Sequence, residues 1–180
     1  LYYAPGIFRM AGAAAESAML QSVIIGFTNL DFTMAALAII DHFGRKRLML
    51  VGSIGYIVSL AGASIAFFTY GTEFTPAGGK AVLLALIVFI ASHAFGQGAV
   101  IWVFISEVFP NRVRARGQAL GSFTHWFFAA FLTLFFPRMA ESLAPSAIFA
   151  FFCFMMVLQL VWVKTMVPET KNVSLEEMQD

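Results

Sequence analysis

Between Lys80 and Glu107 the sequence reads AVLLALIVFIASHAFGQGAVIWVFIS, a stretch of 26 residues without a charged side chain. A helix needs about 20 predominantly apolar residues to cross the hydrocarbon core of a bilayer. A charged side chain near the bilayer centre is costly, so charges are expected at the two ends of such a helix. The stretch therefore predicts a membrane-spanning helix at about residues 81–105.

Comparable stretches lie on both sides of this one. Residues 48–72, 117–137 and 142–163 contain 25, 21 and 22 residues without a charge, and a further apolar stretch is interrupted only by Asp31. Proline disrupts a helix interior, and we expect all six prolines at or beyond the ends of the spans. We therefore predict five transmembrane helices, at about residues 17–40, 48–70, 81–105, 117–137 and 145–166.

The composition agrees with a membrane protein. The chain has 180 residues, of which 60% are hydrophobic and 12% are charged, and its mean hydropathy is +0.83. A soluble domain usually carries about 25% charged residues, which argues against a soluble enzyme. The net charge of +1 argues against nucleic acid as a partner. The single cysteine, Cys153, excludes an internal disulfide and a multi-cysteine metal site. The chain begins with Leu1 and has no visible signal peptide, which favours a fragment.

The basic residues predict an orientation, because cytoplasmic loops of helical membrane proteins carry an excess of lysine and arginine. Eight basic residues follow the first, third and fifth spans, and three lie on the other side. The eight are Arg45, Lys46, Arg47, Arg112, Arg114, Arg116, Lys164 and Lys171, and the three are Arg9, Lys80 and Arg138. We therefore expect a multi-pass protein of the cell membrane whose C-terminal tail, residues 168–180, is cytoplasmic. Ser174 and Glu177 predict a capping box there.

Polar side chains inside the third and fourth spans predict a binding site. Gly96-Gln97-Gly98 is followed by Trp102, and His125 is followed by Trp126. A tryptophan beside amide and imidazole groups suits a sugar, which has apolar faces and a hydroxyl-bearing edge. For any single polar residue, a hydrogen bond between helices is the alternative. The sequence lacks the phosphate-binding loop of an ATPase, and it offers no candidate catalytic residue, cofactor site or metal site.

Four segments carry a resemblance to a known family: Tyr2-Tyr3-Ala4-Pro5-Gly6-Ile7-Phe8, Asp41-His42-Phe43-Gly44-Arg45-Lys46, the segment from Ser106 to Gly117, and Pro168-Glu169-Thr170-Lys171-Asn172. In this order the chain resembles the C-terminal half of the sugar porters of the major facilitator superfamily, including the proton-coupled xylose, arabinose and hexose transporters. The resemblance implies an all-α integral membrane fold, the C-terminal six-helix half of such a transporter. Residues 1–16 would be the outer end of helix seven and an external loop, and 17–167 would hold helices eight to twelve. The N-terminal six-helix half would be a missing partner.

The resemblance also implies roles for individual residues. His93 and His125 stand where the family commonly has phenylalanine and an amide residue, respectively. Tyr2 and Tyr3 would form an external lid, with an interfacial aromatic belt as the alternative. Arg45, Glu107 and Arg114 would form a cytoplasmic gate. The alternative is that they are solvent-exposed charges that only set the orientation of the helices in the membrane. The substrate-binding residues would be Asn29, His93, Gly98, Trp102, His125 and Trp126.

The expected function is transport of a monosaccharide by alternating access, with H⁺ as the coupling ion. The alternatives are a facilitator without proton coupling, a structural or channel-like membrane protein, and a membrane-embedded enzyme using His93 and His125. Asp31 is the single acid inside a span, and at about 100° per residue it lies some 200° around the helix from Asn29. That angle argues against sugar contact and leaves two roles open for Asp31, a hydrogen bond to a neighbouring helix or a part in proton coupling.

Overall fold

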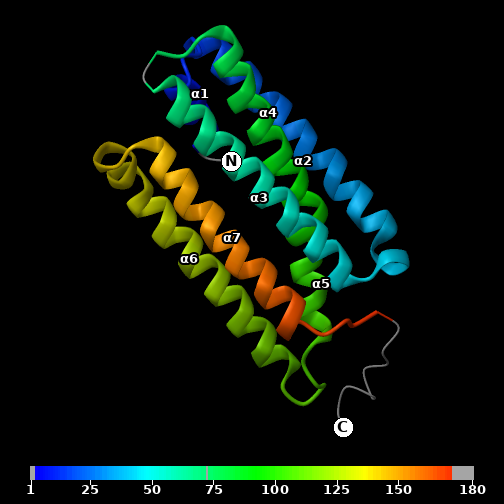
Figure 1. Cartoon of the computed structure of the whole chain (residues 1–180). Coiled ribbons are helices and arrows are strands. Elements are labelled where there is room, and N and C mark those ends of the chain that lie inside the picture. Colours follow the sequence, from blue (N-terminus) through cyan, green and yellow to red (C-terminus); the bar gives the residue numbers. More distant parts are fainter. Residues whose placement is uncertain (1–2, 72, 172–180) are drawn as a thin grey trace.

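Five long helices make up most of the computed structural model, which describes residues 3–71 and 73–171 apart from the side chain of Ala15. A short helix, α1 (Ala4–Met10), precedes α2 (Ala15–Phe43) and α3 (Arg45–Tyr70). The third long helix is continuous from Pro76 to Glu107 and consists of α4 (Pro76–Ser92), η1 (His93–Gly98) and α5 (Ala99–Glu107). The last two are α6 (Arg114–Ser142) and α7 (Pro145–Met166) (Figure 1). The described part of the chain thus confirms an all-α fold with five helices of membrane-crossing length.

The helices extend beyond several of the predicted spans. The structure has Ala15–Phe43 for 17–40, Arg45–Tyr70 for 48–70, Pro76–Glu107 for 81–105 and Arg114–Ser142 for 117–137. The predicted spans end where the charged residues begin. A helix can continue through the polar headgroup region, which adds about 10–15 Å to a hydrocarbon core of about 30 Å. Because α2 begins at Ala15, it already includes the last two residues of the predicted 1–16 segment.

The prediction that every proline lies at or beyond a span end is wrong for Pro137, which lies inside α6. A proline has no N–H, so the carbonyl oxygen four residues earlier, that of Thr133, loses its usual helix partner. In the structure this oxygen accepts a hydrogen bond from the Tyr3 hydroxyl at 2.5 Å. The side chain of Tyr3, the residue just before α1, therefore satisfies the backbone group that the proline leaves open.

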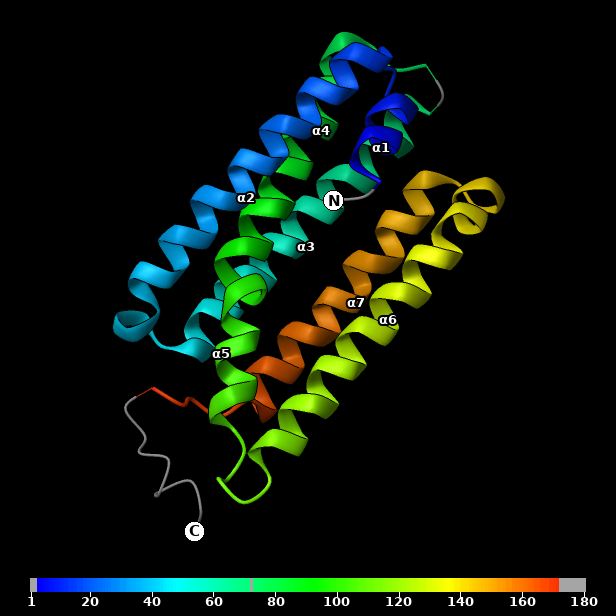
Figure 2. The same cartoon turned by 180° about the vertical axis from the view of Figure 1, so that it is seen from behind.

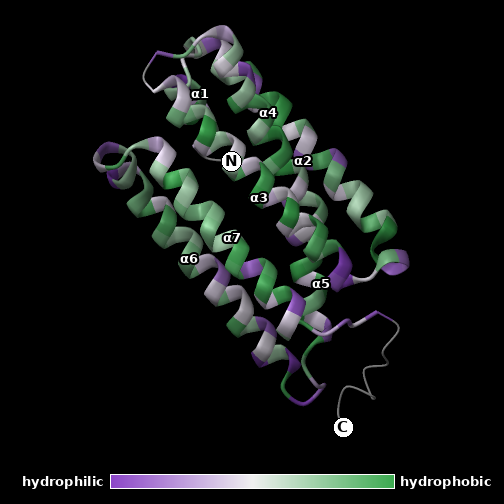
Figure 3. Cartoon of the chain, viewed as in Figure 1, coloured by the Kyte–Doolittle hydropathy of each residue, from purple (hydrophilic) through white to green (hydrophobic). Residues whose placement is uncertain are grey.

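The helix α3 lies at the centre of the packing, because it makes its most extensive contacts with both α7 and α4. The helix α6 runs beside α7 at the edge of the bundle (Figure 2), and Gly117 is its one buried residue. Hydrophobic residues cover the middle of the helices, and hydrophilic residues gather mostly at the two ends of the bundle (Figure 3). Many of the large apolar side chains are exposed, among them Phe68, Leu134 and Met166, as is expected for a protein surrounded by lipid or by further helices.

Two glycines let α3 and η1 approach closely. A Cβ atom added to Gly52 would lie 2.7 Å from the Cα of Gly96 and 2.9 Å from the carbonyl oxygen of Ser92. Both of these are backbone atoms, which cannot move aside as the end of a side chain can. The absence of a side chain at Gly52 thus sets the distance between α3 and the segment that carries His93 and Gly98.

We expect Gly52→Ala to lower the free energy of unfolding by about 1–3 kcal/mol, the usual cost of inserting a methyl group into a well-packed contact. The matched control is Gly62→Ala in the same helix, where the nearest atom to the new Cβ is that of Ala85 at 4.0 Å. Thermal unfolding of the purified protein in detergent measures both variants. Equal melting temperatures for the two would contradict the close contact.

Candidate functional site

A cavity of about 700 Å³ is lined by residues from every helix from α1 to α7, including η1. Its wall is mostly aliphatic and aromatic, with a small number of polar side chains. These are Tyr3, Tyr56, His93, Gln97, His125, Thr133 and Gln159. An apolar pocket of several hundred cubic ångströms with a few polar groups is typical of a site for a small organic molecule.

The η1 segment, His93–Gly98, forms one wall of the cavity and is a π-helix. Such widened turns are rare and are often found at functional sites. Here the turn brings Gly98 against His93, so that a Cβ atom on Gly98 would lie 3.0 Å from the His93 carbonyl oxygen and 3.3 Å from its Nε2. The glycine therefore leaves room for the imidazole ring at the cavity wall.

Gln97, on the same π-helix, is tied to α3. Its Nε2 donates hydrogen bonds to the carbonyl oxygen of Met49 at 3.1 Å and to the hydroxyl of Ser53 at 3.0 Å. The Ser53 hydroxyl in turn donates to the carbonyl oxygen of Met49 at 2.8 Å. These bonds fasten η1 to α3 beside the glycine contact and hold the cavity wall in place.

Trp102 and His125 meet at the cavity from two different helices. The indole of Trp102, on α5, and the imidazole of His125, on α6, have ring centroids 5.1 Å apart in an edge-to-face arrangement. The Trp102 side chain remains 39% exposed, so part of the indole is available to a ligand. The structure thus brings four of the predicted substrate residues, His93, Gly98, Trp102 and His125, to one cavity.

The other predicted substrate and lid residues lie differently. Asn29 and Trp126 are not among the residues lining this cavity. Asn29 is half-buried in α2, and Trp126 is 62% exposed with its indole 5.3 Å from the His125 ring. Tyr3 lines the cavity, and its hydroxyl bond to Thr133 joins the residue just before α1 to α6. Tyr2 lies outside the described residues.

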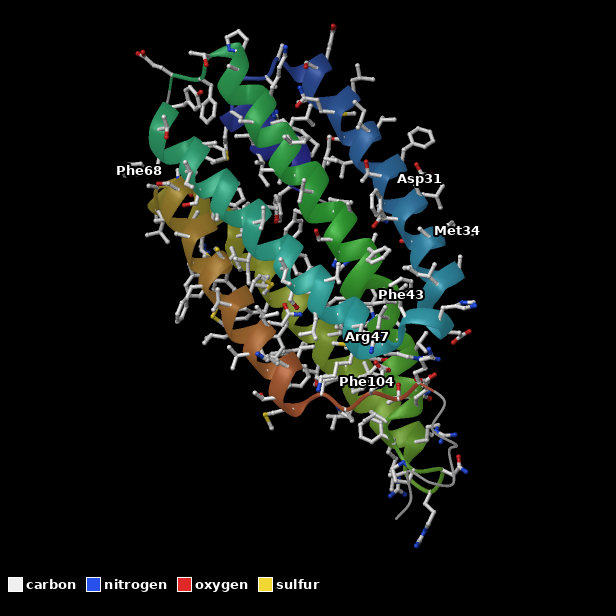
Figure 4. All side chains as sticks on the ribbon, turned by 45° about the vertical axis from the view of Figure 1, so that its right-hand side comes forward. Asp31, Met34, Phe43, Arg47, Phe68 and Phe104 are labelled. Carbon is white, nitrogen blue, oxygen red and sulfur yellow. The ribbon has the colours of Figure 1, made fainter. Side chains whose placement is uncertain are left out.

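Asp31 lies on the outer side of α2, as does Met34 (Figure 4). It is exposed, and no described residue forms a hydrogen bond or ion pair with it. On the opposite side of α2 the helix buries Ile25 and Ala36, with Asn29 on the same face. The two residues that the sequence placed on different faces of this helix therefore do lie on different faces.

A second polar cluster lies at the end of the bundle where the tail begins. The Arg45 guanidinium pairs with the Glu107 carboxylate through Nη2 to Oε1 at 2.6 Å and Nε to Oε2 at 3.0 Å. The two side chains are only 11% and 21% exposed. The Thr170 hydroxyl donates a further bond to Glu107 Oε2 at 2.6 Å. This pair joins the start of α3 to the end of α5 and to the tail.

Glu169 closes the same cluster from the tail. Its carboxylate accepts the backbone N–H groups of Arg45 at 2.9 Å and Lys46 at 3.2 Å. These are free N–H groups at the start of α3, where a negative charge is favourable. Gly44, with φ of +88°, is needed here, because a Cβ on it would lie 2.5 Å from Glu169 Oε2. We call Arg45, Glu107, Glu169 and Thr170 the tail cluster.

Arg114, the third predicted gate residue, does not join the tail cluster. Its Nε donates a hydrogen bond to the carbonyl oxygen of Phe109 at 3.2 Å, which fixes the loop before α6. Within the residues that the structure describes, Arg114 forms no ion pair. The structure therefore brings two of the three predicted gate residues together and adds Glu169 and Thr170, which the sequence had marked only as part of a motif.

Residues 1–180 match the family model described as sugar (and other) transporter. The D-xylose-proton symporter of Escherichia coli (strain K12) is 36% identical over 187 residues, which cover 99% of this chain and 36% of the symporter. The arabinose-proton symporter of Bacillus subtilis (strain 168) is 33% identical over 180 residues, which cover 99% of this chain and 37% of that protein.

Solved structures give the same result. The proton:xylose symporter XylE bound to 6-bromo-6-deoxy-D-glucose has a TM-score of 0.86 at 33% identity over 99% of this chain and 38% of that one. The inward-open conformation of XylE from E. coli has a TM-score of 0.81 at 30% identity over 97% of this chain and 40% of that one. The chain spans little more than a third of the length of these relatives. Over that length it belongs to the sugar porter family of the major facilitator superfamily.

Proposed function

We propose that this chain is the C-terminal half of a secondary transporter that moves a monosaccharide across the membrane by alternating access, coupled to protons. The observation that carries the proposal is the cavity in which Trp102 and His125 meet beside His93 and Gly98. An indole face and imidazole edges match the apolar face and the hydroxyl edge of a sugar. The relatives named as proton symporters of D-xylose and arabinose support proton coupling.

An N-terminal six-helix half is part of the proposal. Trp102 and Trp126 keep large exposed surfaces, and α6 buries only one of its described residues. Surfaces of this kind need a covering partner, and in transporters of this architecture the substrate lies between two halves. We therefore propose that the complete porter, and not this chain alone, binds and moves the sugar.

Uptake by cells that express the complete porter tests this function, with labelled D-xylose, arabinose and D-glucose as substrates. The expected result is saturable uptake of at least one sugar, competition by the unlabelled sugar, and loss of accumulation after a protonophore is added. Uptake that is indifferent to the protonophore would replace the symporter by a facilitator. Product formation without accumulation would favour the membrane enzyme, and no uptake of any of the three sugars would refute the proposal.

The tail is proposed to lie in the cytoplasm, because eight basic residues follow the first, third and fifth spans against three on the other side, and Arg45 of the tail cluster is one of the eight. We expect a cysteine at His42 to react with a membrane-impermeant reagent only after the cells are permeabilised. A cysteine at Glu73, which is exposed in the connection between α3 and α4 at the other end of the bundle, should react in intact cells. Both are placed in a Cys153→Ala background, and the reverse pattern would overturn the orientation.

A further inference from the structure

A hydrogen bond joins Tyr56 in α3 to His93 in η1, two residues that are 37 positions apart in the sequence. The Tyr56 hydroxyl lies 2.5 Å from Nδ1 of His93. Tyr56 is 5% exposed, and its ring packs beside that of Phe89, with ring centroids 4.9 Å apart. The sequence alone assigns no role to Tyr56, although both residues line the candidate sugar cavity.

The surroundings of this bond decide which atom donates. A buried hydroxyl without an acceptor for its hydrogen carries a desolvation cost. Among the described residues, Nδ1 of His93 is the one hydrogen-bond partner of the Tyr56 hydroxyl, and the nearby cavity wall is made of Leu60, Leu86 and Phe89. The hydroxyl therefore donates to Nδ1. A neutral imidazole whose Nδ1 accepts a hydrogen bond carries its own proton on Nε2.

The proton on Nε2 is then available to a ligand. Nε2 lies next to Gly98, whose missing side chain leaves space at this point, and His93 shares the cavity wall with Trp102. No described residue accepts a hydrogen bond from Nε2. The ring thus presents a donor of fixed orientation to the space in which the sugar is proposed to bind.

We propose that Tyr56 is a positioning residue that holds His93 as an Nε2–H donor and thereby makes the porter select sugars with an acceptor oxygen at that point. The inference rests on the proposed function and adds a basis for sugar preference. A site built to pair with a hydroxyl group rejects an analogue that lacks it, because the protein group is left unpaired. A deoxy sugar without that oxygen is therefore discriminated against.

Calorimetric titration of the purified complete porter with D-xylose and D-glucose tests the coupling. Tyr56→Phe keeps the ring packing and removes only the hydroxyl, and we expect an affinity about 3- to 10-fold lower, as for one hydrogen bond. In a His93→Phe background the same change should have no further effect. The control is Tyr70→Phe in the same helix, whose ring packs on Phe74 away from the cavity. An equal loss in both backgrounds would show a merely structural role and overturn the proposal.

Two further measurements separate this inference from the proposed function. Nitrogen NMR of ¹⁵N-histidine-labelled porter should show unprotonated Nδ1 in His93, and a mixture of the two tautomers in Tyr56→Phe; a protonated Nδ1 in the unmodified porter would refute the inference. In a series of monodeoxy-D-glucoses, one position should lose affinity in the unmodified porter but not in Tyr56→Phe. If the unmodified porter binds no sugar at all, the proposed function fails. If it binds normally and Tyr56→Phe changes nothing, only the role of Tyr56 fails.

Discussion

Replacing Trp102 by alanine is expected to weaken sugar binding by roughly 5- to 150-fold, which corresponds to about 1–3 kcal/mol. The indole forms part of the cavity wall and packs edge to face on His125. The substitution removes the large apolar surface that would stack on the sugar, and it also frees the His125 ring from the contact that orients it. Both losses act at the same place, so the effect is expected to exceed that of removing any one hydrogen bond. Titration of the purified complete porter with D-xylose measures it.

The control for this substitution is Trp162→Ala. Trp162 lies in α7, is 45% exposed and does not line the cavity. The substitution therefore removes an indole of the same size from a position outside the site. Its affinity should stay within about twofold of the unmodified porter. Gln159, a polar residue of the same helix, is unsuitable as a remote control because it borders the cavity. Equal losses for Trp102→Ala and Trp162→Ala would mean general destabilisation and would remove Trp102 from the site.

The number of long helices could be predicted because the cost of a charge in hydrocarbon is large compared with any local preference. The same reasoning could not find the helix ends, since a charged residue such as Arg45 or Arg114 is tolerated as soon as the helix reaches the headgroups. It also failed at Pro137. Whether a proline can lie inside a helix depends on a partner for the freed carbonyl oxygen, and here the partner, Tyr3, is 130 residues away in sequence.

Part of the candidate site could also be predicted from the sequence, and part could not. His93, Gly98 and Trp102 belong to one continuous stretch, so their neighbourhood could be expected from the sequence. The bond between Tyr56 and His93 could not, because it depends on how closely α3 packs on η1 and on the register set by Gly52 and the π-helix. A tyrosine in the middle of a predicted span does indicate that a polar partner lies nearby, since a buried hydroxyl needs a hydrogen-bond partner.

The burial of the predicted gate residues could not be predicted from the sequence either. From the sequence, Arg45 and Glu107 are charges at the ends of two spans, and an exposed ion pair contributes less than about 1 kcal/mol. The structure places them largely out of solvent. The Thr170 hydroxyl donates to the Glu107 carboxylate, and the Glu169 carboxylate accepts from the backbone N–H of Arg45. A pair in these surroundings costs more to break than an exposed one, because Arg45 is buried and its other carboxylate partner among the described residues is the exposed Asp41, at 2.9 Å. The tail cluster is therefore a stronger candidate for a conformational lock than its sequence positions indicated.

Glu107→Gln is expected to slow transport by about 5- to 30-fold, as a bias of about 1–2 kcal/mol between two conformations would do. The carboxylate accepts from Arg45 through both oxygens and from Thr170 through Oε2. A glutamine of the same shape has one accepting oxygen and an NH₂ group, so a donor of Arg45 or Thr170 must face another donor. If the tail cluster holds the cytoplasmic side closed, the variant loses that state while the cavity about Trp102 is unchanged. Uptake rates of labelled D-xylose should fall, and the affinity of the purified porter should stay within about threefold.

The matched control is Arg47→Gln, which removes one charge two residues along α3 from Arg45. Arg47 is exposed at the end of that helix (Figure 4) and forms no ion pair within the described residues. Near-normal transport in Arg47→Gln together with slow transport in Glu107→Gln would assign the effect to the buried pair. The two changes shift the net charge in opposite directions, so equal slowing in both would point to a general disturbance of this end of the bundle, and normal rates in Glu107→Gln would reject the gate. The contrast is informative because both changes neutralise one charged side chain at the same end of the bundle, and only Glu107→Gln disturbs the carboxylate that pairs with the buried Arg45 guanidinium. Asp41, which also pairs with Arg45 at 2.9 Å, is unchanged in both variants.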